Sequence, residues 1–294
     1  MFGKVDLVMW TKNGAETLPL VLRRLSESIP AASINNRIIV DDHSTDGTRD
    51  IAKSFGWRVI PSEGTGISDG ANTALKNVET DYFVSVEQDL MLAKNWWDKI
   101  PLYLTELKTA VASGIRFVVE PKGLRKLEQQ MAKKCLGEEK FLLSPQNAQR
   151  EVFTFGKTLD NTIYKTKIIR ALGGFPRTIS GAGVDTILIY KLQRAGFYWA
   201  VDYDVQSVHL RNSLRNELRH RYWYGTVVRE VWSRLKQEFD VQVTAESNLL
   251  YRLLISPASG LINALKTKEP TVIYIYPLLR LYYIRGLLAA SRKL

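Results

Sequence analysis

The stretch that decides the fold is RIIVDDHSTDGT at residues 37–48, in which a short apolar run passes directly into carboxylates and small polar residues. A second stretch of the same kind, YFVSVEQD, follows at residues 82–89. A β-branched run that ends on carboxylates is typical of a buried parallel strand where it leaves its sheet. Open α/β sheets bind ligands outside these carboxyl ends, so both stretches mark a predicted site.

The first acid cluster has two interpretations. Asp46, or Ser44 before it, is expected to cap a helix that starts near Thr48 by accepting a hydrogen bond from a first-turn amide. We expect no such local task for Asp41 and Asp42. Two adjacent carboxylates repel each other, so solvent, a donor-rich ligand or a cation has to offset the cost. A capped helix start with solvated acids explains the cluster equally well.

The second acid cluster indicates a metal site. Glu87 and Asp89 are two residues apart, so on extended backbone they point the same way and can bind one hard divalent cation. A glycine-rich loop at 63–70, with Gly66 and Asp69, precedes a helix and can bring backbone amides close to a phosphate. The loop lacks the lysine of a P-loop, and an ordinary helix-entry loop is the alternative.

The order of apolar segments predicts an α/β fold. Strands at 5–10, 37–40 and 58–60 alternate with helices at 16–28 and 48–55, which implies a parallel sheet with right-handed crossovers. The further elements expected are a helix at 96–107, a strand at 111–119, an irregular stretch or lid at 121–149, a helix at 187–195, and strands at 198–201 and 205–210.

Two residues near the end of this region have both a functional and a structural interpretation. Asp185 precedes the helix at 187–195, where it can be a first-turn acid that complements the helix dipole. His209 ends the last strand, and an isolated histidine on an apolar strand is more often a packed residue than a ligand.

Composition limits the class of protein. The chain has 294 residues and is 45% hydrophobic, which is enough for a substantial core and too much for disorder. Its single cysteine excludes an intramolecular disulfide framework and fits a reducing compartment. The net charge of +11 calls for an anionic partner, which can be nucleic acid, an acidic membrane face or a phosphorylated substrate.

The basic charge is concentrated in a C-terminal region that we expect at the membrane. A basic, aromatic helix at 217–239 precedes two apolar segments at 249–265 and 271–290, both interrupted by arginine and proline. Tyrosines beside arginine and lysine suit the membrane interface, so we predict a monotopic or re-entrant anchor. A soluble helical pair is the alternative. The predicted domains are 1–215, catalytic, and 216–294, membrane-associated.

These motifs together resemble the GT-A glycosyltransferases of family 2. The resemblance covers about residues 5–225 and rests on the turn at 10–13, the octet at 41–48, Glu87-Gln88-Asp89, the Gly-Gly-Phe turn at 173–175 and the acid at 185. It implies a Rossmann-like, mostly parallel sheet flanked by helices. It also implies that the enzyme uses a nucleotide-sugar and a Mg or Mn ion.

The resemblance implies a role for each matching residue. Asp89 would be the main metal ligand, with Glu87 in support, and His209 could complete the metal or phosphate site. Asp185 would be the general base that takes the acceptor proton. The nucleotide-sugar site is expected to comprise Trp10, Thr11, Asn13, Asp41, Asp42, Gly66, Asp69, Glu87, Gln88 and, by a looser match to a Gln-x-x-Arg-Trp element, Arg219, Arg221 and Trp223.

The function expected is that of a metal-dependent inverting glycosyltransferase at the cytoplasmic face of a membrane. It would move a hexose, specifically mannose from GDP-mannose, onto a lipid-linked acceptor in glycan biosynthesis. One alternative is a polyprenyl- or dolichyl-phosphate sugar synthase. From other classes, the alternatives are a nucleotidyltransferase and a basic nucleic-acid-binding protein. Nucleic acid is not the expected partner, because the basic residues lie beside apolar stretches of nearly membrane length.

Overall fold

The computed structural model describes residues 3–136, 157–178, 181–210, 213–241 and 249–291. The chain forms two compact units. The first comprises Met1–Arg116, Leu136–Arg177 and Val184–Leu210, and the second comprises Phe117–Cys135, Thr178–Gly183 and Arg211–Leu294.

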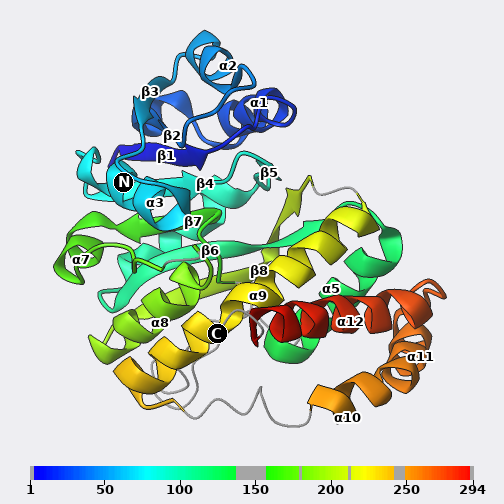
Figure 1. The fold of residues 1–294 in the computed structure, drawn as a ribbon. Helices are drawn as coiled ribbons and strands as arrows, with labels where there is room; N and C mark the ends of the chain where they lie inside the picture. Colours follow the sequence, from blue (N-terminus) through cyan, green and yellow to red (C-terminus); the bar gives the residue numbers. More distant parts are fainter. Residues whose placement is uncertain (1–2, 137–156, 179–180, 211–212, 242–248, 292–294) are drawn as a thin grey trace. The chain divides into compact units, whose positions relative to one another are not determined.

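The described strands form one sheet of eight in the order β3-β2-β1-β4-β7-β6-β8-β5 (Figure 1). β1 is parallel to β2 and β4, and β2 is parallel to β3, whereas β7 is antiparallel to β4 and β6. The strands are β1 Val5–Thr11, β2 Ile34–Asp41, β3 Arg58–Pro61, β4 Tyr82–Val86, β5 Leu90–Met91, β6 Thr109–Val118, β7 Asn161–Lys165 and β8 Tyr198–His209. The predicted α/β fold with a mostly parallel sheet is therefore confirmed.

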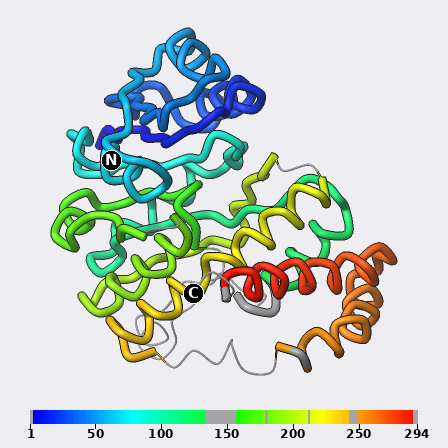
Figure 2. Tube along the Cα trace, viewed as in Figure 1, coloured from blue at the N-terminus to red at the C-terminus, as the bar shows by residue number. Residues whose placement is uncertain are grey.

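Helices connect and cover the strands of the first unit, as the chain trace in Figure 2 shows. α1 packs against α2 and β5, while α3 packs on β1 and β2. α1 forms because four apolar residues at helical spacing, Leu18, Val21, Leu22 and Leu25, share one buried face. The helices of this unit are α1 Leu18–Ser28, η1 Ala31–Ser33, α2 Thr48–Ser54, α3 Gly66–Lys76, α4 Trp96–Lys99, η2 Ile100–Thr105, α7 Thr166–Ala171 and α8 Val184–Arg194.

The parallel register aligns the carboxyl ends of β1 and β2 at one edge of the sheet. Thr11 pairs with Asp41, and the Asp42 amide donates to the Thr11 carbonyl at 2.8 Å. β4 runs parallel to β1 on its other side, with Val8 opposite Ser85. The residues that follow these strands therefore leave the sheet at the same edge, where open α/β sheets bind their ligands.

The second unit is helical and is organised around α12. Its helices are α5 Lys122–Leu136, α9 Leu214–Phe239, α10 Leu249–Leu254, α11 Ser256–Thr267 and α12 Val272–Ser291. α12 packs against both α9 and α11. α9 and α12 cross with their backbones in contact, because a Cβ on Gly225 would lie 2.2 Å from the Tyr283 carbonyl oxygen. A side chain at Gly286 would likewise meet the Tyr222 carbonyl oxygen, at 2.1 Å.

Several predicted elements were wrong in extent. The helix expected at 96–107 ends at Lys99 and continues as the 3₁₀ helix η2, which has a proline in its first turn. The irregular stretch expected at 121–149 is helical as far as Leu136, because Leu124, Leu127 and Ala132 are buried among exposed basic residues. Residues 137–149 lie outside the described part.

The other differences concern breaks between elements. The apolar segment at 249–265 is two helices, with Pro257 in the first turn of the second, where its missing N–H has no cost. The two strands expected at 198–201 and 205–210 are the single strand β8.

Candidate active site

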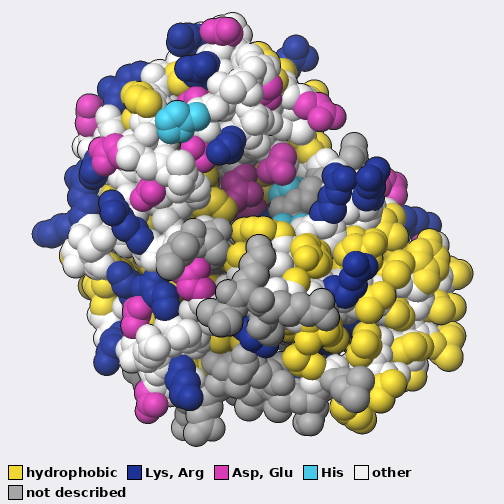
Figure 3. Space-filling model, in the orientation of Figure 1, with side chains coloured by type: hydrophobic (Ala, Val, Ile, Leu, Met, Phe, Trp, Pro, Cys, Tyr) yellow, Lys and Arg dark blue, Asp and Glu magenta, His cyan; other side chains and the backbone are white. Residues whose placement is uncertain are grey.

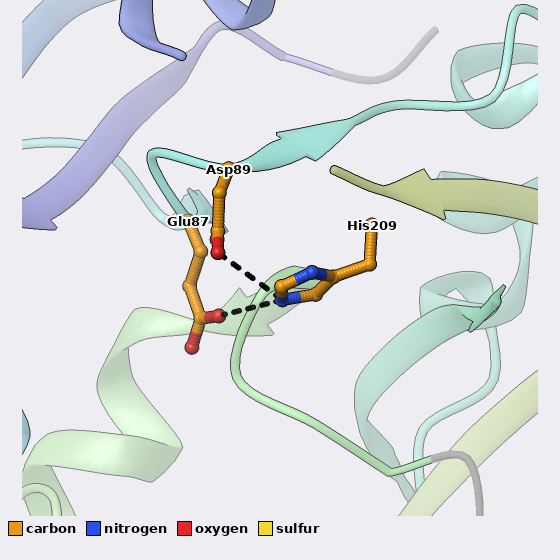
Figure 4. A group of neighbouring side chains, drawn as sticks. All are labelled: Glu87, Asp89 and His209. Atoms are coloured by element: carbon orange, nitrogen blue, oxygen red, sulfur yellow. Dashed lines mark ion pairs between the residues drawn. The ribbon is translucent and has the colours of Figure 1, made fainter. Parts of the chain in front are cut away.

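The chain after β4 carries two acids that meet a histidine from a distant strand. Glu87 and Asp89 follow β4, and His209 is the last residue of β8. The antiparallel pairing of β5 with β8 sets Leu90 opposite His209, which brings the histidine beside Asp89. His209 Nε2 lies 3.4 Å from a carboxylate oxygen of Asp89 and 4.0 Å from one of Glu87 (Figure 4). One ligand atom from each residue lies within 4.8 Å of the other two, so these three residues can hold a metal ion.

The burial of this cluster suits a bound cation. The His209 side chain is 1% exposed, whereas those of Glu87 and Asp89 are 25% and 29% exposed. The Leu210 amide donates to the Asp89 carbonyl at 2.7 Å, which ties the two chain segments together beside the cluster. The imidazole is thus held in a buried position, while the two carboxylates keep part of their surface exposed. Carboxylates suit Mg²⁺ and Mn²⁺, and an imidazole favours the transition metal of the two.

Asp41, at the end of β2, binds within its own loop. Its carboxylate accepts the Ser44 amide at 3.0 Å and lies 3.8 Å from Arg49 Nε. The expectation that Asp41 lacks a local task is therefore wrong, because it closes the turn that leads into α2. Its other carboxylate oxygen is buried and has no hydrogen-bond partner within the part of the chain that the structure describes.

Asp42 is also bound within the protein, but its partners are not amides of the first turn of α2. It accepts the Gly66 amide at 3.0 Å, and Lys12 Nζ and His43 Nδ1 lie 3.4 Å and 3.1 Å from its oxygens. Burial acts to raise the pKa of Asp42, but the hydrogen bonds from Gly66, His43 and Lys12 outweigh it and leave the pKa below its usual range. Asp42 thus joins the ends of β1 and β2 to the glycine-rich loop.

Asp46 performs the predicted capping task in a modified form. Its carboxylate accepts the Thr48 amide at 3.1 Å, while Gly47, with φ 84°, occupies the N-cap position of α2. The same carboxylate accepts the Ala15 amide at 3.0 Å, so Asp46 also fixes the turn after β1.

Gln88 fastens the end of β4 to the end of β1. Its amide oxygen accepts the Lys12 amide at 2.9 Å and the Thr11 hydroxyl, and its amide nitrogen donates to the Lys12 carbonyl at 3.0 Å. Asn13 has φ 49° and accepts the Thr45 amide at 2.9 Å. Thr11, Asn13 and Gln88 are thus placed at the predicted edge, with much of their hydrogen bonding used inside the protein.

The remaining residues of the first unit that were predicted to bind the nucleotide-sugar lie in or beside the glycine-rich loop. Gly66 has φ 80°, which favours glycine, and is the first residue of α3. Asp69 accepts the Thr65 amide at 3.1 Å and lies 3.8 Å from Arg177 Nε. Trp10 is buried, with its ring 6.1 Å from that of Phe175.

Asp185 stands in the first turn of α8. One of its carboxylate oxygens accepts the Thr186 amide at 2.6 Å. Burial raises the pKa of Asp185, while the Thr186 amide and the charge of Arg116 act to lower it and the charge of Asp160 adds to the increase. A carboxylate with a raised pKa is better matched to accepting a proton near neutral pH.

Three further residues that were predicted to bind the nucleotide-sugar belong to α9 of the second unit: Arg219, Arg221 and Trp223. Arg221 Nε lies 2.9 Å from a carboxylate oxygen of the buried Glu217, and the Trp223 ring lies 5.6 Å from that of His220. Arg221 thus has an acidic partner one turn away within its own helix.

Sequence reasoning missed Lys12, Arg116 and Asp160. Lys12 follows Thr11 directly, and its position at a strand end was a usable signal. Arg116 Nε lies 2.6 Å from the fully buried Asp160 carboxylate, although the two residues are far apart in the sequence. Only the pairing of β6 with β7 brings them together.

Comparisons with known proteins agree with this geometry. The family model described as glycosyl transferase family 2 matches residues 6–173. No curated protein sequence matches the chain. Among solved structures, a mannosyltransferase from Pyrobaculum calidifontis in complex with GDP-Man and Mn2+ aligns with a TM-score of 0.67 and 16% identity, over 100% of this chain and 88% of that one.

Two further structures are similar in fold. S. aureus TarS 1–349 in complex with UDP-GlcNAc has a TM-score of 0.58 and 14% identity, over 99% of this chain and 92% of that one. Glucosyl-3-phosphoglycerate synthase from Mycobacterium tuberculosis, with Mn2+ and UDP, has a TM-score of 0.54 and 14% identity, over 82% of each chain. Identities this low establish the fold, whereas the family match spans more than half of the chain. The chain belongs to glycosyl transferase family 2 and is a glycosyltransferase of the GT-A fold.

Proposed function

We propose that the protein is a metal-dependent, inverting hexosyltransferase that takes mannose from GDP-mannose and transfers it to a lipid-linked acceptor. The observation that carries this proposal is the cluster of Glu87, Asp89 and His209 at the carboxyl edge of a GT-A sheet. Support for the donor comes from the similar mannosyltransferase of known structure, which binds GDP-Man and Mn2+.

The three clustered residues would hold the metal. Two carboxylates and one imidazole fit Mn²⁺, and they fit Mg²⁺ less well because imidazole is a softer ligand. The ion, when bound, would supply positive charge beside the departing nucleoside diphosphate. The protein's own contribution is to hold Asp89 and His209 in register through the β5–β8 pairing.

The other predicted residues have roles in binding and proton transfer. Asp42 and Trp10 would contact the nucleoside, and the glycine-rich loop with Asp69 would lie along the ribose or phosphates. Arg219, Arg221 and Trp223 would act on the diphosphate and the sugar. Asp185 would accept the proton of the acceptor hydroxyl while that oxygen attacks the anomeric carbon from the face opposite the leaving group. The single displacement inverts the configuration at that carbon.

Donor use is tested by screening nucleotide-sugars with the full chain. We expect GDP-mannose with Mn²⁺ to raise the thermal unfolding temperature and to be turned over, and UDP-sugars to do so less. Asp89→Ala is the matched variant and should lose the metal-dependent part of both signals. If only a UDP-sugar raises the unfolding temperature, the donor is that UDP-sugar and not GDP-mannose. If no nucleotide-sugar raises it, the proposal is overturned.

The acceptor is tested through Asp185. A hydroxyl acceptor has to lose a proton as it attacks, whereas a lipid phosphate attacks as an anion and needs no strong base. Asp185→Asn should therefore lower transfer to a hydroxyl acceptor by at least about 100-fold. A variant that stays active on polyprenyl phosphate would instead favour the alternative function, a polyprenyl-phosphate sugar synthase.

We also propose that residues 1–215 are the catalytic domain and that residues 216–294 associate with the cytoplasmic face of a membrane. Apolar side chains gather over α11 and α12 on the face in Figure 3, and the exposed ones include Leu261, Ile262 and Leu265. α12 is long and apolar enough to cross a bilayer, by length and composition only. α11, with 12 residues, is too short, at about 18 Å against about 30 Å of hydrocarbon.

The packing of α12 favours an orientation in the plane of the membrane. α12 is in backbone contact with α9, a helix that carries charged residues along its length. If α12 spanned the bilayer, charged residues of α9 would enter the bilayer with it. Each charge placed at the bilayer centre would cost about 2.5–3.5 kcal/mol. An anchor that lies in the interface keeps these charges in water.

Membrane binding is tested by sedimentation with liposomes at matched salt. Leu265→Glu, which adds a charge to the exposed face of α11, should lower the bound fraction several-fold. Leu107→Glu is the control, because Leu107 is exposed on the first unit. Retention on DNA at the same salt, with no liposome binding, would favour the nucleic-acid alternative.

A further inference from the structure

Gln88 lies between the two acids of the metal cluster, and its side chain is bonded to the end of β1. Both ends of its amide group bind Lys12, the oxygen by accepting the backbone N–H at 2.9 Å and the nitrogen by donating to the backbone carbonyl at 3.0 Å. The oxygen also accepts the hydroxyl of the buried Thr11. The β1 end therefore uses both acceptor positions of the Gln88 oxygen, and the amide serves the protein more than a ligand.

A glycine beside this amide leaves room for it. A Cβ on Gly14 would lie only 2.6 Å from Gln88 Oε1. The Gly14 backbone is itself held in place, because its N–H donates to the Thr48 hydroxyl at 2.8 Å and its carbonyl accepts the Leu18 amide at 2.9 Å. A side chain at position 14 would therefore push the Gln88 amide away from β1.

The turn that carries the two acids is attached to two strands. The Leu90 amide donates to the Glu87 carbonyl at 3.2 Å, which closes a tight turn with Gln88 and Asp89 at its centre. Leu90 pairs with His209 across β5 and β8. The turn is thus attached to β8 through its last residue and to β1 through the side chain of Gln88.

We propose that Gln88 is a positioning residue, which fixes this turn so that Glu87 and Asp89 meet at one cation. The proposal rests on the proposed role of these two acids as metal ligands. Without the amide, the ordering of the two carboxylates would take place only when the ion binds, at a cost in conformational entropy. Groups that orient metal ligands from outside commonly change metal affinity by about 10–100-fold.

The test is Mn²⁺ binding to the full chain without nucleotide, measured by the paramagnetic resonance signal of free Mn²⁺. Gln88→Met keeps the length of the side chain and removes its bonds to β1, so the dissociation constant should rise at least about tenfold. Thr11→Val removes one bond and should have a smaller effect in the same direction. Gly14→Ala keeps Gln88 but displaces its amide, and should approach the effect of Gln88→Met. An unchanged dissociation constant in Gln88→Met would overturn the proposal.

Asn72 on α3 offers a matched control. Its side-chain amide also binds backbone groups, donating to the carbonyls of Ser68 at 2.8 Å and Phe175 at 2.9 Å and accepting the Phe175 amide at 2.9 Å. Asn72→Leu should lower the thermal unfolding temperature and leave the Mn²⁺ dissociation constant unchanged. If it weakens Mn²⁺ binding as much as Gln88→Met does, general destabilisation explains the effect and the proposal is overturned.

Rescue of sugar transfer by the metal provides a second readout. Gln88→Met keeps both carboxylates, so excess Mn²⁺ should restore kcat toward the parent value. Asp89→Ala lacks a ligand and should not be restored. A rate that excess Mn²⁺ does not raise in Gln88→Met would contradict the positioning role. If Gln88→Met fails to fold, Gly14→Ala and Thr11→Val decide the question by the same two measurements.

The outcome also separates this proposal from the proposed function. If Asp89→Ala binds Mn²⁺ as tightly as the parent chain, the metal site itself fails, and the role of Gln88 fails with it. If Asp89→Ala loses Mn²⁺ but Gln88→Met binds it like the parent, only the positioning role fails. A different donor sugar would leave Mn²⁺ binding without nucleotide unaffected.

Discussion

The acids at the end of β2 and those after β4 look alike in sequence and differ in their surroundings. Asp41 accepts a backbone amide from its own loop, and Asp42 accepts the Gly66 amide beside two basic side chains. Glu87 and Asp89 instead converge on His209, which arrives from a strand more than a hundred residues later. The first pair of acids binds groups at the edge of the sheet, and the second pair lies close enough to His209 for the three residues to hold a cation.

This difference has a local cause in the backbone. Adjacent acids such as Asp41 and Asp42 point to opposite sides of extended backbone, so each finds its own partners. Glu87 and Asp89 were expected on extended backbone, but the structure has a turn there, closed by the Leu90 amide, which donates to the Glu87 carbonyl at 3.2 Å. A third possible ligand, His209, comes from another strand. A buried imidazole that can act as a ligand therefore distinguishes the β4 site more clearly than the number of acids does.

The strongest test of the comparison is Asp89→Ala. Loss of a main metal ligand should reduce metal-dependent sugar transfer by at least about 100-fold. The free energy of unfolding should change little, since the Asp89 side chain is 29% exposed. Sugar transfer and thermal unfolding of the same preparation give the answer. Transfer at the parent rate would show that the β4 acids do not hold the ion.

A sharper test is His209→Gln. The amide keeps a polar group at this buried position but removes the imidazole, so the Mn²⁺ concentration for half-maximal transfer should rise about tenfold. The effect on Mg²⁺-supported transfer should be smaller, because Mg²⁺ prefers oxygen ligands. Titrating both ions against the parent enzyme provides the control. Equal changes for the two metals would assign His209 to packing.

Local sequence patterns predicted the strands of the sheet. They could not predict which of the acids at the strand ends form hydrogen bonds or ion pairs within the protein. The runs at 37–40 and 82–86 predicted strands, and the structure has β2 and β4 there. The partners of Asp42 were not predictable, since Lys12 and Gly66 approach it only after β1, β2 and α3 have packed. Helical spacing of apolar residues in α5 was obscured by glycine and many basic residues, so that segment was assigned as irregular.

The residues of the candidate site are likewise brought together by pairing between strands that are far apart in the sequence. His209 was proposed as a ligand through the family resemblance, and its contact with Asp89 depends on the β5–β8 pairing. The Arg116–Asp160 ion pair gave no sequence signal, because its partners come from two strands paired in antiparallel register. Sequence reasoning identifies residue types at strand ends, and the topology of the sheet decides which of them meet.

A third test addresses the structural side of the comparison. Asp41→Ala removes the acceptor of the Ser44 amide, and an unpaired buried donor costs about 1–3 kcal/mol. We therefore expect the free energy of unfolding to fall by that amount, as measured by urea denaturation. Asp89→Ala is the matched control, with an expected loss well below 1 kcal/mol. Equal losses in the two variants would remove the structural distinction between the two pairs of acids.

The smallest expected effect is the contribution of Asp42 to the pH dependence of the protein's stability against unfolding. Its pKa in the folded protein lies below the ordinary value of 3.8, so the unfolded chain binds more protons near pH 4. The stability that Asp42 contributes is present above about pH 4 and is lost as the pH falls through the folded pKa. Asp42→Asn should make the fall in stability below pH 4 shallower, as measured by thermal unfolding from pH 5 to pH 3. High salt should reduce this difference only in part, because Lys12 is 57% exposed and is screened while the bond from the Gly66 amide is not. An unchanged slope in Asp42→Asn would mean that these contacts do not stabilise the charged form of Asp42, and the distinction between the two pairs of acids would fail.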